Sequence, residues 1–277
     1  PTETVYGLAA DARNESAVRR IFAAKGRPAD HPLIVHIASG ERLLDWAASV
    51  PTTAALLADA CWPGPLTLLV PKAAHVLPLV TGGRDTVGVR VPAHPLTTEL
   101  LRRFGGGVAA PSANRFGKVS PTAAQHVALD LGNRVDYILD GGPCPIGVES
   151  TIVDCTVDPP QVLRPGGISA ATVEALLERP LAPVSGPSRA AGMLASHYAP
   201  SARVLLADSP AQARHLATEH DGAWVLDHTD DLVTYARVLY AELRAADERG
   251  VAVIIAVLPP AEGLGHAIRD RLTKAAA

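Results

Sequence analysis

The chain has 277 residues, which is room for one large domain or two modest ones. Hydrophobic residues make up 48% and charged residues 19%, so ordinary buried cores are expected and a disordered chain is not. The net charge of −3 and the aromatic content of 4% argue against a whole-chain electrostatic or stacking grip on nucleic acid. A local basic pocket remains compatible with this composition.

The three cysteines, Cys61, Cys144 and Cys155, are odd in number and lack CxxC spacing, so they predict neither a disulfide framework nor a metal site. No apolar run approaches the length of a membrane span, and we expect no signal peptide. These features favour a cytoplasmic protein without a membrane partner. The chain opens on Pro1 without an initiator methionine, so we expect that residues precede it.

The first half, up to about residue 180, alternates short apolar runs with helical stretches. Val18, Ile21 and Phe22 have helical spacing, with Asn14 as an N-cap and Gly26 as a stop.

Further helices are predicted over 95–104 and over 121–131. Ser120 is placed to cap the second of these, with Pro121 at its first position. Strands are predicted at 33–37, 66–70, 86–91, 108–110, 137–139, 150–153 and 161–163. The mixture indicates an α/β domain over 1–180 with a twisted, mixed sheet.

Residues 181–201 are rich in Pro, Ser, Gly and Ala, which predicts a linker. The segment ends with His197 and Tyr198, side chains that a passive spacer does not need. We therefore expect it to act as a lid over the site. The alternative is that His197 and Tyr198 only dock the second domain.

The last part, 202–277, alternates more regularly. Strands are predicted at 204–207, 223–226 and 251–258, and helices at 210–219, 232–248 and 264–274. This βαβαβα order predicts a smaller Rossmann-like α/β domain with a parallel sheet.

Several chemical signatures are missing from the sequence. There is no GxxxxGK[ST] loop, no GxGxxG after a strand, no GxSxG elbow and no HExxH. Gly105 to Gly107 follow a predicted helix and are typical of a helix stop. An enzyme of this sequence would therefore act by positioning and charge stabilisation.

Basic residues stand instead at the ends of predicted elements. Lys25 and Arg27 close the first helix, and Arg90 and Arg164 end two strands. Each has a plain alternative, such as a cation at a helix C-terminus or on an edge strand. Together the four predict a pocket rim that suits a polyphosphate.

Polar side chains near these positions are weaker signals. Ser112 and Asn114 fit an ordinary turn, and His36 in a strand is more often a core histidine than a substrate contact. Hydroxyls also occur at Thr2, Thr86, Ser120 and Ser150.

Eight short strings follow one another along the chain: PTETVYGL (1–8), AKGRP (24–28), PLIVH (32–36), WPGPLT (62–67), APSAN (110–114), VEST (148–151), LRPG (163–166) and SHYAP (196–200). In this order they resemble the two-domain form of the YrdC-like family, the threonylcarbamoyl-AMP synthases. The resemblance covers nearly the whole chain, and it also implies an N-terminal strand and helix that this sequence does not contain.

The resemblance implies that L-threonine and bicarbonate give N-carboxythreonine, whose carboxylate attacks the α-phosphate of ATP. Threonylcarbamoyl-AMP and pyrophosphate would leave, and a partner transferase would move the threonylcarbamoyl group to adenosine in tRNA. Mg²⁺ would travel with ATP, so no protein ligand cluster is expected.

The resemblance also assigns residues to each substrate. Lys25 and Arg27 are expected to hold phosphates and to be the catalytic residues. The threonine side would include Thr2, His36, Arg90, Ala110 and Ser150. The nucleotide side would include Lys25, Arg27, Ala29, Thr86, Ser112, Asn114, Ser120, Arg164, His197 and Tyr198.

Two other functions are compatible with parts of the sequence. A carbamoyl-adenylate enzyme of hydrogenase maturation would need zinc-finger and acylphosphatase-like segments, which are not visible here. A double-stranded RNA-binding module without catalysis could use the basic pocket, although the acidic net charge weakens that alternative.

Overall fold

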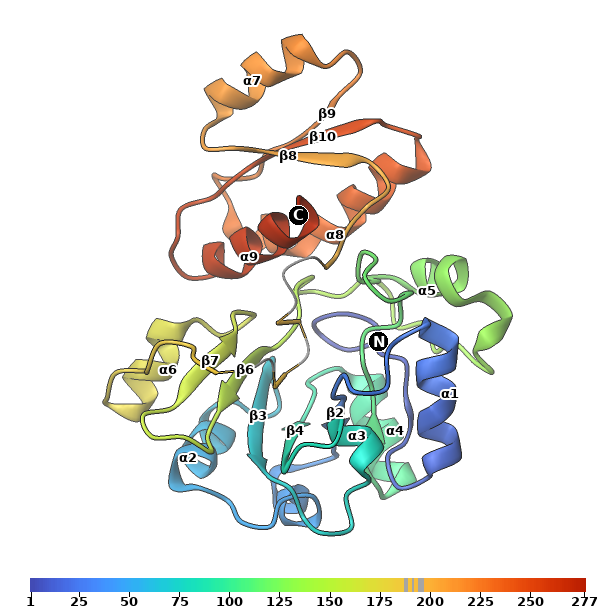
Figure 1. The fold of residues 1–277 in the computed structure, drawn as a ribbon, viewed down its shortest axis with the longest axis vertical. Coiled ribbons are helices and arrows are strands. Elements are labelled where there is room, and N and C mark those ends of the chain that lie inside the picture. The colour runs from blue at the N-terminus through green and yellow to red at the C-terminus, as the bar shows by residue number, and fades with distance from the viewer. Residues whose placement is uncertain (187–188, 191, 194–196) are drawn as a thin grey trace.

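The computed structural model describes residues 1–186, 189–190, 192–193 and 197–277. Figure 1 shows a larger N-terminal unit below and a smaller C-terminal unit above. A seven-stranded sheet lies in the first and a three-stranded sheet in the second, which confirms the predicted α/β class with a second, smaller domain. Of the predicted linker and lid, residues 187–188, 191 and 194–196 lie outside the described residues.

The large sheet is mixed, with the order β1-β5-β2-β4-β3-β6-β7. β2 pairs with β4 and β3 with β6 in parallel, and the other neighbours are antiparallel. The order brings the ends of strands far apart in sequence to one region, where the candidate site lies. The strands are β1 (Ala10–Asp11), β2 (Ile34–His36), β3 (Leu66–Pro71), β4 (Thr86–Arg90), β5 (Val108–Ala109), β6 (Thr151–Asp154) and β7 (Gln161–Arg164).

The first helix, α1 (Glu15–Lys25), begins after Asn14 and ends before Gly26, as predicted. The Asn14 side chain accepts a hydrogen bond from the Ala17 amide, and Gly26 adopts a left-handed conformation with φ of 63°. The other helices here are α2 (Thr52–Cys61), α3 (Pro78–Thr81), α4 (Pro95–Phe104), α5 (Ala124–Leu131) and α6 (Ala170–Leu177), with 3-10 turns at Gly40–Asp45 and Gly132–Arg134.

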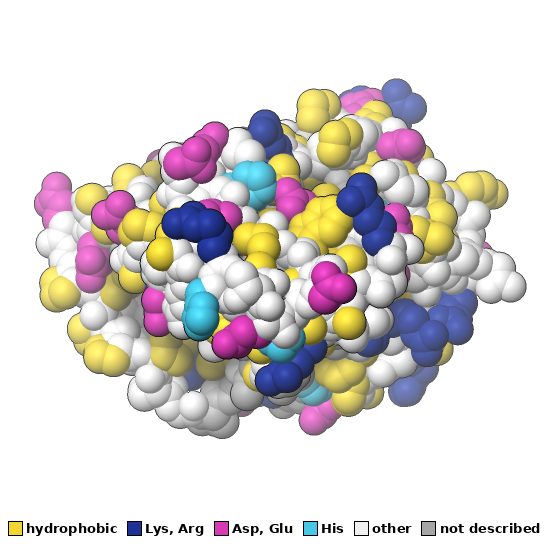
Figure 2. Space-filling model, turned by 90° about the horizontal axis from the view of Figure 1, so that it is seen from above, with side chains coloured by type: hydrophobic (Ala, Val, Ile, Leu, Met, Phe, Trp, Pro, Cys, Tyr) yellow, Lys and Arg dark blue, Asp and Glu magenta, His cyan; other side chains and the backbone are white. Residues whose placement is uncertain are grey.

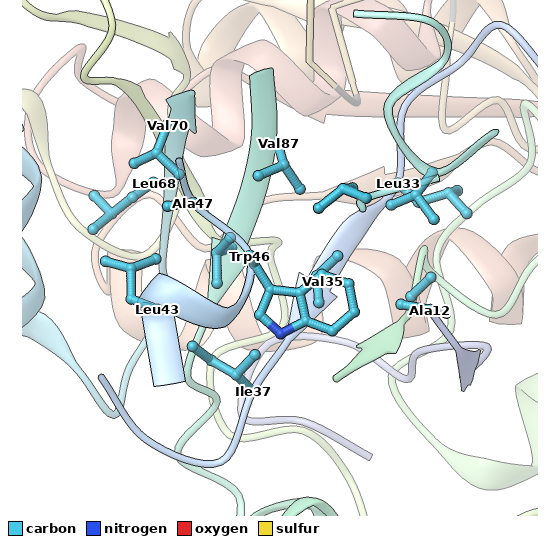
Figure 3. Packing of buried hydrophobic residues seen from close by; sticks show 14 of the residues in the cluster. Ala12, Leu33, Val35, Ile37, Leu43, Trp46, Ala47, Leu68, Val70 and Val87 are labelled. Atoms are coloured by element: carbon cyan, nitrogen blue, oxygen red, sulfur yellow. The ribbon is translucent and has the colours of Figure 1, made fainter. Parts of the chain in front are cut away.

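Trp46 packs at the centre of the main core, among Val35, Ile37 and Leu43 (Figure 3). A Cβ atom on Gly107 would lie 2.5 Å from the Trp46 ring, so only glycine fits where the chain enters β5. The glycine run thus both ends α4, through the left-handed Gly105, and lets β5 approach the core.

The smaller domain has the predicted βαβαβα order and a parallel sheet, β8-β10-β9. Figure 1 shows α8 and α9 on the side that faces the larger domain, and α7 on the opposite side. The elements are β8 (Arg203–Ala207), α7 (Pro210–Glu219), β9 (Trp224–Leu226), α8 (Leu232–Glu248), β10 (Val253–Val257) and α9 (Gly265–Ala275).

The two domains share a hydrophobic core. Val5, Val119 and Val148 of the larger domain pack in one cluster with Tyr198 and with buried residues of α8 and α9. Gly147 passes so close to α8 that a Cβ atom there would lie 2.3 Å from the Ala236 carbonyl oxygen. The interface is therefore tightly packed, and side chains from α8 and α9 reach the larger domain.

Two predicted elements are wrong. Ser120 does not cap a helix: α5 begins at Ala124 after an N-cap without a side-chain bond, and the Ser120 hydroxyl donates to Glu149 instead, at 2.6 Å. Residues 137–139 form no strand, because they pair with no neighbouring strand and the Tyr137 side chain is 91% exposed.

Within the described ranges, every helix is too short or too polar to cross a membrane.

Candidate active site

A small cavity of about 60 Å³ lies where strands of the large sheet end, and Gly192, His197 and Tyr198 form part of its wall. Its walls come from the segment before β1, the end of α1, the ends of β2, β4 and β7, and the loop after β5. Pockets for nucleotide-sized ligands usually enclose ~300–1,000 Å³. The cavity is therefore closed in this structure, and part of its wall must move before a nucleotide can enter.

Lys25 and Arg27 line the cavity from the end of α1, but their surroundings differ. The Lys25 ammonium is buried and donates to the carbonyl oxygens of Ser112 and Asn114, both at 2.5 Å. It thereby holds the loop after β5 in place. Burial, followed by the nearby charge of Arg27, lowers the pKa of Lys25 well below its usual value.

Arg27 retains bonding capacity that Lys25 lacks. One terminal nitrogen donates to the Pro32 carbonyl at 3.1 Å, and the guanidinium lies 5.6 Å from the centre of the Phe116 ring. Its Nε is buried without a hydrogen-bond partner. Burial lowers the pKa of Arg27 to about 10, and the positive charge of Arg164 acts in the same direction. A buried donor without an acceptor is costly, so Arg27 is suited to bind an anion.

Arg90 ends β4 and is held in a fixed position. Its Nη2 donates to Glu3 Oε1 at 2.5 Å, its Nη1 to Thr4 Oγ1 at 2.9 Å and its Nε to the Gly64 carbonyl at 3.1 Å. A guanidinium has five N–H groups, so these contacts fix its orientation without using all of them. Arg90 was predicted from the sequence as a site residue, whereas Glu3 and Thr4, which position it, were not.

Arg164 and Ser150 form a second fixed group at the ends of β7 and β6. Arg164 donates through Nε and Nη2 to the Ser150 carbonyl oxygen, at 3.0 and 2.8 Å, and through Nη2 to the Ser150 hydroxyl. The Ser150 hydroxyl also lies 2.8 Å from Thr67 Oγ1. Burial lowers the pKa of Arg164.

His36 and His197 are both buried cavity residues and both neutral near pH 7. Burial, aided by Arg90, lowers the pKa of His36 to about 3, and its Nδ1 lies 3.3 Å from the Ile34 carbonyl oxygen. Burial also lowers the pKa of His197 to about 3. The Nδ1 atom of His197 is buried without a partner, which makes it a second unsatisfied group at this site.

His197 and Tyr198 line the cavity, and we call these two residues the lid pair; their role as a lid stays a prediction. Tyr198 is 1% exposed and has φ of 63°, a left-handed conformation that a bulky residue rarely adopts. Its ring stacks on Tyr240 of α8 at 5.5 Å between centroids, and the His197 amide donates to the Lys274 carbonyl of α9. Contacts with the C-terminal domain thus hold the lid pair in place.

Glu149 is the main functional residue that the sequence analysis missed. Both carboxylate oxygens are used: Ser120 donates to Oε1 at 2.6 Å, and Tyr240 and Arg271 donate to Oε2 at 2.9 and 2.8 Å. Although burial would raise its pKa, Arg271 and then Arg164 lower it to about 2. A glutamate in the apolar string around 148–153 was the available signal, since a buried charge needs a partner.

Most predicted site residues come together at this cavity. Thr2, Lys25, Arg27, His36, Arg90, Ala110, Ser112, Asn114, Ser150, Arg164, His197 and Tyr198 all line it. The Thr2 hydroxyl is already used within its own turn, where it donates to the Val5 carbonyl at 2.7 Å.

Three predicted nucleotide residues do not line the closed cavity. Ala29 is exposed beyond the end of α1, and Ser120 is buried behind Glu149. Thr86 begins β4 and Arg90 ends it, so the extended strand separates the two by ~13 Å. The closed structure therefore gives no support to a nucleotide contact at these positions.

A larger cavity of about 400 Å³ lies beside the first and shares Thr2, Gly7, His36 and Ala110 with it. Its remaining wall is largely apolar and runs along α1, β5 and residues 134–139. At its rim Arg20 and Asp136 form an ion pair at 2.8 Å. The smaller cavity, with its buried cations, is therefore the candidate active site.

Known proteins are similar to this chain over nearly its whole length. Residues 1–166 match the family described as Telomere recombination, and residues 168–277 match the family described as Threonylcarbamoyl-AMP synthase, C-terminal domain. The chain is 44% identical over 301 residues to threonylcarbamoyl-AMP synthase of Pyrococcus abyssi, covering 99% of this chain and 88% of that protein. It is 43% identical over 312 residues to the Bacillus subtilis protein of the same name, covering 100% and 88%.

A solved structure is similar over the whole length. The crystal structure of P. abyssi Sua5 complexed with L-threonine matches with a TM-score of 0.94 and 42% identity, covering 100% of this chain and 89% of that one. Fold, site and relatives together define an enzyme of the nucleotidyltransferase type. The chain belongs to the threonylcarbamoyl-AMP synthase family.

Proposed function

We propose that this enzyme forms threonylcarbamoyl-AMP and pyrophosphate from L-threonine, bicarbonate and ATP. The product would supply the threonylcarbamoyl group for modification of adenosine in tRNA by a partner transferase, in the cytoplasm. The names of the relatives support the reaction, and the chemistry of the cavity supports it independently.

One observation carries the proposal: the cavity is lined by four basic side chains, Lys25, Arg27, Arg90 and Arg164, and by one carboxylate, Glu149. Burial lowers the pKa of Lys25, Arg27 and Arg164, so each of these cations is less favoured here than in water. The cavity carboxylate, Glu149, already binds Arg271 and two hydroxyls. A bound polyphosphate would supply negative charge, and Arg27 Nε offers it an open donor.

Threonine would bind near Thr2, His36, Arg90, Ala110 and Ser150, which line the same cavity. The unused N–H groups of Arg90 can bind the amino-acid carboxylate, because Glu3 and Thr4 hold the guanidinium in place. Neutral His36 adds no second positive charge there. A similar protein was crystallised with L-threonine, which supports an amino-acid site in this fold.

The reaction needs alignment and charge neutralisation more than covalent help from the protein. The threonine nitrogen takes up carbon dioxide from bicarbonate to give a carbamate. A carbamate oxygen then bonds to the α-phosphorus as the bond to the β-phosphate oxygen breaks, and pyrophosphate leaves with that electron pair. Arg27 is placed to stabilise charge on the phosphates, and the lid pair to exclude water.

Magnesium would enter with ATP, whose phosphates it neutralises when bound. The described residues contain no group of three or more His, Cys, Asp or Glu side chains that could hold a metal ion. Since the Glu149 oxygens are occupied by donors, we propose that the protein binds the metal only through the nucleotide.

An RNA-binding module without catalysis has little physical support. Lys25, Arg90 and Arg164 are at most 5% exposed, so they cannot reach the phosphates of a duplex. On the face seen in Figure 2, Lys and Arg side chains are mixed with Asp and Glu rather than gathered in one patch.

Pyrophosphate release tests the proposed function. The protein should release pyrophosphate from ATP only when threonine and bicarbonate are both present, and serine should substitute poorly for threonine. Release that needs neither co-substrate would contradict the proposal, as would ATP binding without any release.

A further inference from the structure

Arg271 belongs to α9 of the C-terminal domain but contacts the active-site region of the other domain. It is completely buried. Its Nε donates to Glu149 Oε2 at 2.8 Å, and its Nη2 donates to the Pro165 carbonyl oxygen, next to Arg164, at 3.0 Å. Within its own helix Nη1 donates to Asp270, at 2.5 Å.

The same guanidinium touches the lid pair. Its carbon lies 5.2 Å from the centre of the Tyr198 ring, which also stacks on Tyr240 and lies edge-on to His197. One turn further along α9, Lys274 donates to the Gly192 carbonyl at 2.7 Å and accepts from the His197 amide. α9 therefore contacts the chain on both sides of residues 194–196.

Glu149 connects these contacts to the cavity wall. It accepts from Ser120 of the larger domain and from Tyr240 and Arg271 of the smaller one. The next residue, Ser150, is the partner of Arg164 and of Thr67. A shift of Glu149 would therefore move Ser150 and the Arg164 group with it.

We propose that Arg271 is a positioning residue for the reaction: from the C-terminal domain it fixes Glu149 and Tyr198, so that domain docking sets the closed geometry of the active site. The proposal rests on the proposed function for its activity assay. It assigns the C-terminal domain a direct part in catalysis without a residue that touches substrate.

A purely structural ion pair would behave differently from a positioning one. The domains share a second ion pair, Arg244 of α8 with Asp130 of α5 at 2.6 Å, and Arg244 also donates to the carbonyl oxygens of Val119 and Ser120 rather than to Glu149 itself. If an ion pair only holds the domains together, removing it should lower only the free energy of unfolding. If Arg271 also positions Glu149 and Tyr198, removing it should change kcat and the pH dependence of kcat as well.

Arg271→Gln removes the charge that Glu149 faces. The groups around Glu149 are then Arg164 of β7, Tyr240 of α8, Ser120 and the lid pair, in which burial keeps His197 neutral and raises the pKa of Tyr198 to about 12. With Arg164 as the remaining cation, the carboxyl should bind a proton more readily.

The experiment compares kcat, the KM for threonine and the pH profile of pyrophosphate release for the parent enzyme, Arg271→Gln and Arg271→Lys. Arg271→Gln should lower kcat about tenfold or more, as loss of a charged hydrogen bond does, with threonine KM little changed. Its rate should fall further as the pH is lowered from about 8 to about 6, unlike that of the parent. Arg271→Lys keeps the charge and should restore the parent's pH profile with an intermediate kcat.

The matched control is Arg269→Gln, which changes an arginine of the same helix whose guanidinium donates to Pro259 of its own domain. It should leave all three quantities unchanged. The inference is overturned if Arg271→Gln keeps the parent kcat, or if it loses kcat with an unchanged pH profile. If Arg271→Gln does not fold, Arg271→Lys is the test, and a kcat equal to that of the parent would overturn the inference. An inactive parent enzyme would instead count against the proposed function.

¹³C NMR of labelled glutamate gives a readout that needs no activity. The Glu149 carboxyl should titrate at higher pH in Arg271→Gln than in the parent. An unchanged titration would contradict the positioning role even if the reaction were another one.

Discussion

At the scale of single residues, Lys25 and Arg27 show how two neighbouring cations can have different roles. Lys25 donates to two backbone carbonyls and so organises the loop that carries Ser112 and Asn114. Arg27 has a buried Nε without an acceptor. We therefore assign phosphate binding mainly to Arg27 and loop structure mainly to Lys25.

Arg27→Ala should lower kcat/KM by ~30-fold to ~1,000-fold, because removing a charged donor from a transition state costs ~2–4 kcal/mol. Steady-state pyrophosphate release measures this. Arg19→Ala is the control, since Arg19 lies on the same helix and pairs with Glu15 at the surface. A rate for Arg27→Ala within about threefold of the parent would remove Arg27 from phosphate binding.

At the scale of elements, the sequence predicted the helix ends that are set by contacts within one helical turn. The cap at Asn14 and the left-handed Gly26 could be read from the sequence because both act within one turn of α1. The role of Ser120 could not be read from the sequence, since its hydroxyl bonds to Glu149, 29 residues away, rather than to a helix N-terminus. Residues 137–139 were predicted as a strand from their composition, which does not show whether a partner strand is present.

The same limit applies to the site. Eleven of the twelve predicted residues that line the cavity stand in the ordered strings, and the twelfth, Arg90, was predicted from its place at the end of a strand. Glu3, Thr4 and Glu149 stood inside the strings without being selected. Arg271 had no signal at all, since its role depends on how α9 packs against the larger domain.

The lid pair yields a prediction at this scale. Tyr198→Ala removes the ring that Tyr240 and Arg271 hold over the cavity, so water should enter and the labile adenylate should be lost. Adenylate captured per pyrophosphate released should fall about tenfold or more, while ATP still binds in calorimetry. Tyr198→Phe keeps the ring stack and should fall much less.

Synthesis by Tyr198→Ala at nearly the parent rate would show that the lid pair only docks the second domain. A simultaneous fall in thermal stability would then be expected, because the ring belongs to the shared core.

At the scale of the whole molecule, buried histidines make stability depend on pH. Burial lowers the pKa of His36 and His197 to about 3 and that of His126 to about 4. The unfolded chain binds protons at these histidines near pH 6.5, and the folded chain does not. The free energy of unfolding should therefore be highest above about pH 6.5 and decrease as the pH falls.

Each histidine should remove up to about 1.4 kcal/mol per pH unit below about pH 6.5. Urea unfolding from about pH 7.5 to about pH 5 measures the slope, and His126→Gln, outside the active site, should reduce it by up to one proton. A free energy of unfolding that does not change over this range would contradict the buried, neutral state of these side chains.

In our proposal one cavity binds both the phosphates of ATP and the amino acid. A crystal structure with ATP and L-threonine tests this most directly. We predict the triphosphate at Arg27 and Arg164, the threonine carboxylate at Arg90, and a displaced Tyr198 ring, because about 60 Å³ cannot hold a nucleotide. Nucleotide bound elsewhere, with the cavity still closed under Tyr198, would contradict it.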